Sequence, residues 1–251
     1  STPLKAYVTA LDPKSDVMEK LEKFKIDTLP VIDGNDHFIG VIRSRNLLGV
    51  LKETLATEMQ TMVGVSKDER ALSSSWFAVK KRLPWLQINL LTAFLAAAVV
   101  GVFEDTIAQY TALAILLPIA AGQSGNTGAQ ALAVTMRGLT LREITVRHWL
   151  RVTTKEAGAA LINGVAIAIT CGAGVYFWSS SVGLALIIAL AMISSMLIAA
   201  VSGALVPIIL KKMGQDPALS SSIILTTVTD IAGFMSFLGI ATLLSGMLEA
   251  G

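Results

Sequence analysis

Long stretches without a charged residue most constrain what this chain can fold into. Ala157–Leu210 has no Asp, Glu, Lys or Arg in 54 residues, and Leu83–Phe103 and Thr106–Met136 have none in 21 and 31 residues. A helix needs about 20 mainly apolar residues to cross a bilayer, so each stretch is long enough. The whole chain is 15% charged, against about 25% in soluble domains. The sequence therefore predicts an α-helical membrane protein.

These stretches divide into five predicted transmembrane helices. The turn signal in residues 178–183, Trp-Ser-Ser-Ser-Val-Gly, splits the longest stretch into a third and a fourth span, and Pro217–Leu248 is the fifth. Basic residues flank the spans on alternate sides only: Lys80, Lys81 and Arg82 before the first, Arg137, Arg142, Arg147, Arg151 and Lys155 after the second, and Lys211 and Lys212 after the fourth. The positive-inside rule then predicts a cytoplasmic N-terminus and an outer C-terminus.

A polar, mixed-charge region precedes the spans. Residues 1–82 hold 13 of the 20 Lys and Arg and 11 of the 18 Asp and Glu, so no signal peptide is expected at this end. We predict a small α/β domain in residues 1–51, a connecting helix or linker in 52–82, with a turn over 64–68, and the transmembrane domain in 83–251. The small domain is expected to begin with a helix over 17–24 that Ser15 or Asp16 caps. Strands over 28–33 and 38–42 should follow, joined by a turn in which Gly34 supplies a positive φ. A second helix is expected over 46–51.

Asp230 is the only charged residue between Pro217 and Leu248. A carboxylate at mid-membrane costs about 2.5–3.5 kcal/mol even on insertion scales, so such a group normally faces a cavity, a partner or an ion. Thr226, Asp230 and Gly233 share one helical face. The alternative is a structural role, in which threonine hydroxyls and backbone groups satisfy the buried carboxylate.

The second span carries an unusual polar segment. Gly122, Asn126 and Gln130 fall roughly on one helical face. The amide oxygens of Gln123, Asn126 and Gln130 suit a cation that keeps its water. The alternative is that this segment serves helix packing, because Gly125 and Ala129 form a small-xxx-small pair. Lys155 and Glu156 are expected to be a solvated or snorkelling pair at the membrane edge.

Several function classes are not supported by the residues. The chain lacks a His/Cys cluster of the zinc type and a phosphate-binding Walker motif, and nothing resembles a nucleic-acid-binding patch. The one cysteine, Cys171, excludes a disulfide within the chain. An enzyme is not expected, and an intramembrane hydrolase in particular lacks a His, Lys or second Asp beside Asp230 in the spans.

Two motif sets carry a family resemblance. The segments Leu-Pro-Val-Ile-Asp at 29–33 and Ile-Gly-Val-Ile at 39–42 resemble a cystathionine-β-synthase (CBS) domain. CBS modules normally come in pairs, so either a first copy precedes this one in a longer protein or the pairing is with another chain. The chain resembles the MgtE family of magnesium transporters. Four features carry this resemblance: the CBS-like unit, the five predicted spans, the segment from Pro118 to Gln130, and the Thr-Val-Thr-Asp at 227–230.

The resemblance implies a homodimer in the bacterial plasma (inner) membrane, with a pore on the twofold axis. It implies that Asp230 supplies the ion-binding carboxylate, with Asn126 beside it and the backbone around Thr226 facing the ion. Asp216 matches a cytoplasmic acid of the family, and Glu58 remains in the connecting helix. Arg43 and Arg45, however, stand where the family has acidic residues. This departure argues against closure by cytoplasmic Mg²⁺ and against nucleotide binding by the CBS unit.

The leading hypothesis is therefore a passive or channel-like pathway for Mg²⁺ or a related divalent cation. An ion-coupled metal exporter, in which Asp230 alternates between proton and metal, is a second hypothesis, and a membrane-anchored CBS sensor without transport is a third. Mg²⁺, Co²⁺ and Mn²⁺ all accept oxygen ligands, so the sequence leaves selectivity among them open. It also leaves open whether the pathway is a channel or a carrier.

Overall fold

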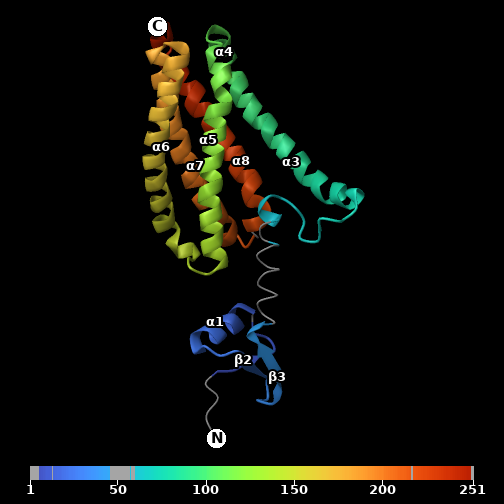
Figure 1. Cartoon of the computed structure of the whole chain (residues 1–251). Helices are drawn as coiled ribbons and strands as arrows, with labels where there is room; N and C mark the ends of the chain where they lie inside the picture. The colour runs from blue at the N-terminus through green and yellow to red at the C-terminus, as the bar shows by residue number, and fades with distance from the viewer. Residues whose placement is uncertain (1–5, 13, 46–56, 58–59, 216, 250–251) are drawn as a thin grey trace. The chain divides into compact units, whose positions relative to one another are not determined.

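The structure is a computed structural model that describes residues 6–12, 14–45, 57, 60–215 and 217–249 (Figure 1). The chain divides into two compact units between Gln60 and Thr61. The first is a small sheet with one helix, and the second is a bundle of long helices. The predicted second helix over 46–51 lies outside the described residues, as do residues 52–56, 58 and 59 of the predicted connecting helix or linker.

The first unit is a three-stranded sheet in the order β1-β2-β3. Its elements are β1 (Val8–Thr9), α1 (Lys14–Phe24), β2 (Thr28–Ile32) and β3 (Phe38–Arg43). β1 pairs with β2 in parallel, and β2 pairs with β3 antiparallel, with Leu29 opposite Ile42. Val8, Val17, Leu21 and Leu29 form the buried core, so α1 covers the sheet with its apolar stripe.

Two sequence expectations for this unit are wrong in detail. The helix begins at Lys14, so Ser15 and Asp16 lie in its first turn and do not cap it from outside. In the turn between β2 and β3, the positive φ of 61° belongs to Asp36 and not to Gly34. The side chain of Asp33 organises this turn: it accepts the backbone N–H groups of Asn35 and His37, each at 2.8 Å. These donors, His37 first, hold the pKa of Asp33 below its ordinary value.

The second unit is an up-and-down bundle of five long helices, joined by short turns (Figure 1). Its elements in chain order are α3 (Ser75–Val102), α4 (Glu104–Gln109), α5 (Ala112–Thr140), the 3₁₀ turn η1 (Val146–His148), α6 (Trp149–Ser179), α7 (Val182–Lys212), α8 (Pro217–Leu243) and α9 (Gly246–Glu249). The predicted turn between the third and fourth spans is present, because α6 ends at Ser179 and α7 begins at Val182. There Ser180 has a left-handed φ of 56° and the Ser181 hydroxyl accepts the Leu184 N–H at 3.3 Å.

α7 lies at the centre of the bundle, packed against α5, α6 and α8. The large buried side chains of this core include Leu113, Ile187, Ile188, Met192 and Phe237. α3 packs mainly against α8, and Figure 1 shows its first half diverging from the other helices. α3 starts eight residues before the predicted first span, so the predicted boundary at residue 83 falls inside a helix.

The segment that leads into α3 is fastened to it by charged groups. Gly64, with φ of 77°, makes the predicted turn within residues 64–68. Glu69 is buried and accepts hydrogen bonds from the Nε and Nη2 groups of Arg82 on α3. A bidentate pair of this kind fixes orientation as well as distance. The start of the membrane unit is therefore held by a specific ion pair.

Four of the described helices are long and apolar enough to cross a membrane: Ser75–Val102, Val146–Ser179, Val182–Lys212 and Ser221–Leu243. α5 is equally long at 29 residues. It has a lower mean hydropathy because Gln123, Asn126 and Gln130 lie near its middle. Four spans are thus supported by length and composition, and the count of five stays a prediction that depends on α5.

Candidate ion-binding site

α5 and α8 approach each other closely because small residues line their contact. A Cβ atom added to Gly128 would lie 2.9 Å from Thr229 Cγ2, and one added to Gly233 would lie 3.0 Å from Ser124 Oγ. The buried Ser124 hydroxyl also lies 3.2 Å from the Thr229 carbonyl oxygen and donates to it. Small residues let helix backbones approach, and hydroxyls then bond between helices. This contact fixes the position of α8 next to α5 at the level of Thr229.

Asp230 follows Thr229 directly, so its position is fixed by the same contact. It is partly buried, and within the described part of the chain no group donates a hydrogen bond or forms an ion pair with its carboxylate. The neighbouring threonines do not satisfy it. Thr227 donates to the Ile223 carbonyl at 2.8 Å, and Thr229 donates to the Thr226 carbonyl at 3.0 Å. The hydroxyls of Thr227 and Thr229 are therefore used by the backbone of α8 and do not satisfy the Asp230 carboxylate.

Asn126 and Gly122 lie on a different face of α5 from the contact with α8. Asn126 is two residues from both Ser124 and Gly128, which places it about 160° around the helix from that contact. Asn126, Gly122 and Gln130 are exposed, and open space surrounds the position where a Gly122 side chain would lie. No hydrogen bond joins the described side chains of Asn126 and Asp230. One copy of the chain therefore does not assemble the complete predicted site.

Thr226 lines a cavity of about 480 Å³ at the beginning of α8. Polar groups from two helices meet there: Asn89 of α3, and Ser222 and Thr226 of α8. The sequence analysis did not select Asn89 or Ser222. For Asn89, the signal available in the sequence was an amide side chain within the uncharged stretch Leu83–Phe103. Arg82, which is paired with Glu69, also lines the cavity, so the neutral oxygens lie beside a guanidinium group.

The remaining predicted ligands, Asp216 and Glu58, lie outside the described residues. Within the ranges that the structure covers, no group of three or more His, Cys, Asp or Glu side chains is arranged to hold a metal ion. Among the described residues of the predicted site, a single carboxylate, that of Asp230, is thus accompanied by neutral oxygens.

Glu156 was expected to be part of a solvated or snorkelling pair, and its position differs from that expectation. It is buried, with 8% of its surface exposed, and lies 2.6 Å from the Nζ atom of Lys155. Lys155 is mostly exposed. The lysine behaves as predicted, whereas the carboxylate is enclosed by the packing of α5 and α6 around it.

Comparison with known proteins gives the family of both units. Residues 117–240, from near the beginning of α5 to near the end of α8, match the divalent cation transporter family MgtE. The membrane part of this chain belongs to the MgtE family. Residues 5–53 match the CBS domain. The MgtE match contains Gly122, Asn126, Thr226 and Asp230, which are the described members of the predicted site.

Characterised relatives agree with this assignment. The chain is 28% identical over 233 residues to the magnesium transporter MgtE of Bacillus subtilis, a match that covers 93% of this chain and 52% of that protein. It is 28% identical over 247 residues to the magnesium transporter MgtE of Thermus thermophilus, covering 96% and 54%. The MgtE protein of Enterococcus faecalis is 27% identical over 232 residues, covering 92% and 51%. This chain spans about half the length of the relatives it matches.

Proposed function

We propose that this chain forms the ion-conducting part of a magnesium transporter, and that two copies build the pathway. The observation that carries the proposal is Asp230, a partly buried carboxylate on an apolar helix with no partner among the described groups. The cost of a carboxylate at this depth is compensated when a cation binds to it. The three relatives named magnesium transporters support Mg²⁺ as that cation.

The exposed polar face of α5 supports a dimer. Gly122, Asn126 and Gln130 face outward from one copy, and amides facing lipid tails would lose hydrogen bonds that hydrocarbon does not replace. A twofold axis beside α5 and α8 would cover this face and bring two Asp230 carboxylates to one ion. The two copies would then supply the charge that one carboxylate lacks.

Such a site suits hydrated Mg²⁺. This ion demands near-octahedral geometry and dehydrates reluctantly, so it usually keeps several waters. Carboxylates of Asp230, the amide of Asn126 and the backbone around Thr226 would then bind the water shell of the ion. The cavity that contains Asn89, Ser222 and Thr226 would be the approach to this site.

Charge placement supports an inward direction of transport. Basic residues lie at the end of the bundle formed by the α5–α6 turn and the end of α7, whereas Glu104 and Asp105 lie at the other end. The positive-inside rule places the basic end in the cytoplasm of a bacterial plasma membrane. The membrane potential would then drive a cation inward with about 2.3 kcal/mol per charge per 100 mV.

Flux measurements test the function. Purified protein in liposomes should take up Mg²⁺ when a potassium diffusion potential makes the interior negative, and a pH gradient should have no effect. Adding Co²⁺ or Mn²⁺ outside measures selectivity. Uptake that requires a proton gradient would instead support the ion-coupled exporter, and an absence of any flux would support the sensor without transport.

The dimer predicts cross-links at defined positions. In a Cys171→Ser background, a cysteine at Ala129 on α5 or at Thr226 on α8 should form disulfide-linked pairs in the membrane. A cysteine at Ile162, which is 74% exposed on α6, is the matched control and should remain monomeric. Gel mobility under non-reducing conditions reads out the result. Equal cross-linking at all three positions, or none with transport retained, would contradict a shared pore.

A further inference from the structure

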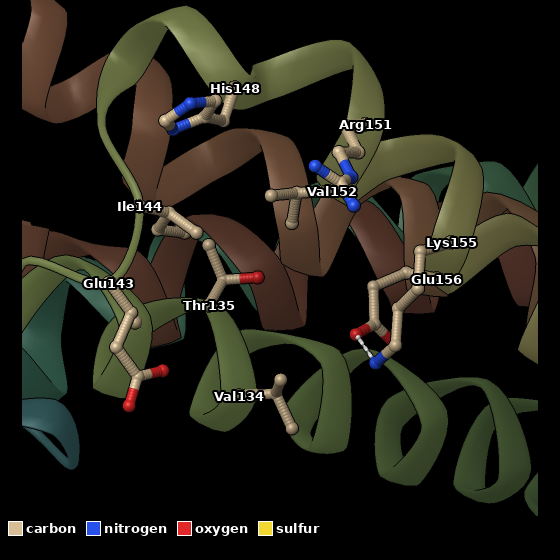
Figure 2. Close-up of a pocket in the computed structure, with 10 residues that line it drawn as sticks. Val134, Thr135, Glu143, Ile144, His148, Arg151, Val152, Lys155 and Glu156 are labelled. Carbon is tan, nitrogen blue, oxygen red and sulfur yellow. Dashed lines mark hydrogen bonds and ion pairs between the residues drawn. The ribbon is translucent and has the colours of Figure 1, made fainter.

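A second polar cavity lies between the end of α5 and the beginning of α6, away from Asp230 (Figure 2). Its volume is about 370 Å³. It is lined by Val134, Thr135, Gly138, Glu143, Ile144, His148, Arg151, Val152, Lys155 and Glu156. The proposed ion pathway uses none of these residues. The cavity is at the basic end of the bundle, where the loop from Arg137 to Lys155 carries five cationic side chains and one carboxylate.

A buried hydroxyl in this cavity lacks a hydrogen-bond partner. Thr135 is 1% exposed, and no described group bonds to its Oγ1 atom. Figure 2 shows this hydroxyl directed away from Ile144, toward the side of the cavity on which Val152 and Arg151 are drawn. A buried polar atom is normally satisfied by protein, water or ligand. The hydroxyl therefore marks a position that a polar group of a ligand can occupy.

Both carboxylates that line the cavity are already paired with cations, Glu143 with an arginine outside the lining. The carboxylate of Glu156 is paired with Lys155 at 2.6 Å, and that of Glu143 is paired with Arg137 at 3.5 Å. Arg151 forms no ion pair with any described residue. An arginine in this situation is suited to a phosphate or carboxylate, which its planar group can bind through two N–H donors.

His148 adds a further donor. Its Nδ1 atom accepts the backbone N–H of Thr145 at 3.0 Å. That bond requires an unprotonated Nδ1, so the neutral ring carries its hydrogen on Nε2 and can donate it. Arg151, His148 and Thr135 thus offer donors from α6, η1 and α5 around one cavity, which is the arrangement that binds a tetrahedral anion.

The surroundings indicate that the anion carries apolar chains. Val134 lines the cavity and is 53% exposed, and Trp149 and Leu150, which lie between His148 and Arg151 in the sequence, are 48% and 58% exposed. Tryptophan is enriched at membrane interfaces, and basic pockets between transmembrane helices on the cytoplasmic side bind phospholipid head groups. A free phosphate would have no use for the exposed apolar side chains at the rim.

We propose that this cavity binds the phosphate group of an anionic phospholipid from the cytoplasmic leaflet. Arg151 and His148 hold the phosphate oxygens, the Thr135 hydroxyl donates from below, and the acyl chains lie along the exposed apolar residues of α5 and α6. The proposal rests on the membrane orientation given above and is independent of the role of Asp230.

Lipid retention tests the proposal. Native mass spectrometry of the purified protein should show phosphatidylglycerol retained in preference to phosphatidylcholine. Arg151→Gln should lower this retention about tenfold, as expected for the loss of a charge-assisted hydrogen bond. Arg147→Gln is the matched control, because it removes the same charge from the same loop outside the cavity. Equal losses in the two variants would overturn the proposal in favour of general surface attraction.

Two further measurements separate the remaining explanations. Thr135→Val keeps the shape of the side chain and removes the hydroxyl, so it should lower phosphatidylglycerol retention without lowering thermal stability. Unchanged retention would overturn the assignment of Thr135. Inorganic phosphate in excess should not displace the lipid. Displacement by phosphate would overturn a phospholipid as the ligand, and so would equal retention of phosphatidylglycerol and phosphatidylcholine. Mg²⁺ flux by the same variants is a separate readout that tests the proposed function.

Discussion

Replacing Asp230 by asparagine should abolish voltage-driven Mg²⁺ flux into liposomes and leave the bundle folded. The substitution keeps the shape of the side chain and removes the charge. At about 5 Å and an effective dielectric constant near 20, one carboxylate attracts a divalent cation by on the order of 6 kcal/mol. A dimer would lose two such contributions, so binding should fall below what flux measurements detect.

The fold should survive because Asp230 makes no described hydrogen bond or ion pair that the change would break. Thermal unfolding in detergent should therefore match that of the unsubstituted chain, or rise. Asp105→Asn on α4 is a matched control, since it also removes a carboxylate, but at one end of the bundle and away from Asp230. It should alter flux only slightly. Asn126→Ala should reduce flux less than Asp230→Asn, because an amide contributes a dipole and not a charge. Normal flux through Asp230→Asn would exclude the proposed site.

Much of the membrane fold could be predicted from where charges are absent. The turn near Ser180 was predicted from its serines and glycine, and each predicted span overlaps one long helix over most of its length. The start of α3 was not predicted, because the basic residues Lys80, Lys81 and Arg82 placed the beginning of the first span at residue 83. α3 includes them because long basic side chains can reach water from within a helix. In the small domain, the two-residue strand Val8–Thr9 is too short to show a periodic pattern.

The candidate site was predicted in part. Asp230 was identified because one charge in a long apolar stretch has few explanations. That the hydroxyls of Thr227 and Thr229 bond to their own helix depends on side-chain rotamers, which the sequence does not specify. The burial of Glu156 depends on how α5 and α6 pack around it, so helical period alone could not predict it. That Asn126 faces away from the contact with α8 follows only when Ser124 and Gly128 are known to form that contact.

Gly203→Ala should strongly destabilise the bundle. A Cβ atom at this position would lie 2.3 Å from the carbonyl oxygen of Gly128 and 3.0 Å from the Cβ atom of Ala131. The first of these is a backbone atom of α5, so the contact is relieved only if α5 and α7 separate. Overpacking of this kind costs about 1–3 kcal/mol.

The separation should also reduce transport, because Gly128 contacts Thr229 on its other side and Thr229 precedes Asp230. We therefore expect Gly203→Ala to lower the midpoint of thermal unfolding in detergent and to lower Mg²⁺ flux in the same preparation. Gly174→Ala on α6 makes the same chemical change where no atom lies within 4 Å of the new methyl group, and it should leave both quantities unchanged or slightly raise stability. If both variants proved equally stable and active, the contact of α5 with α7 would not determine the position of α8. The geometry around Asp230 would then have to depend on the contact of α8 with α7.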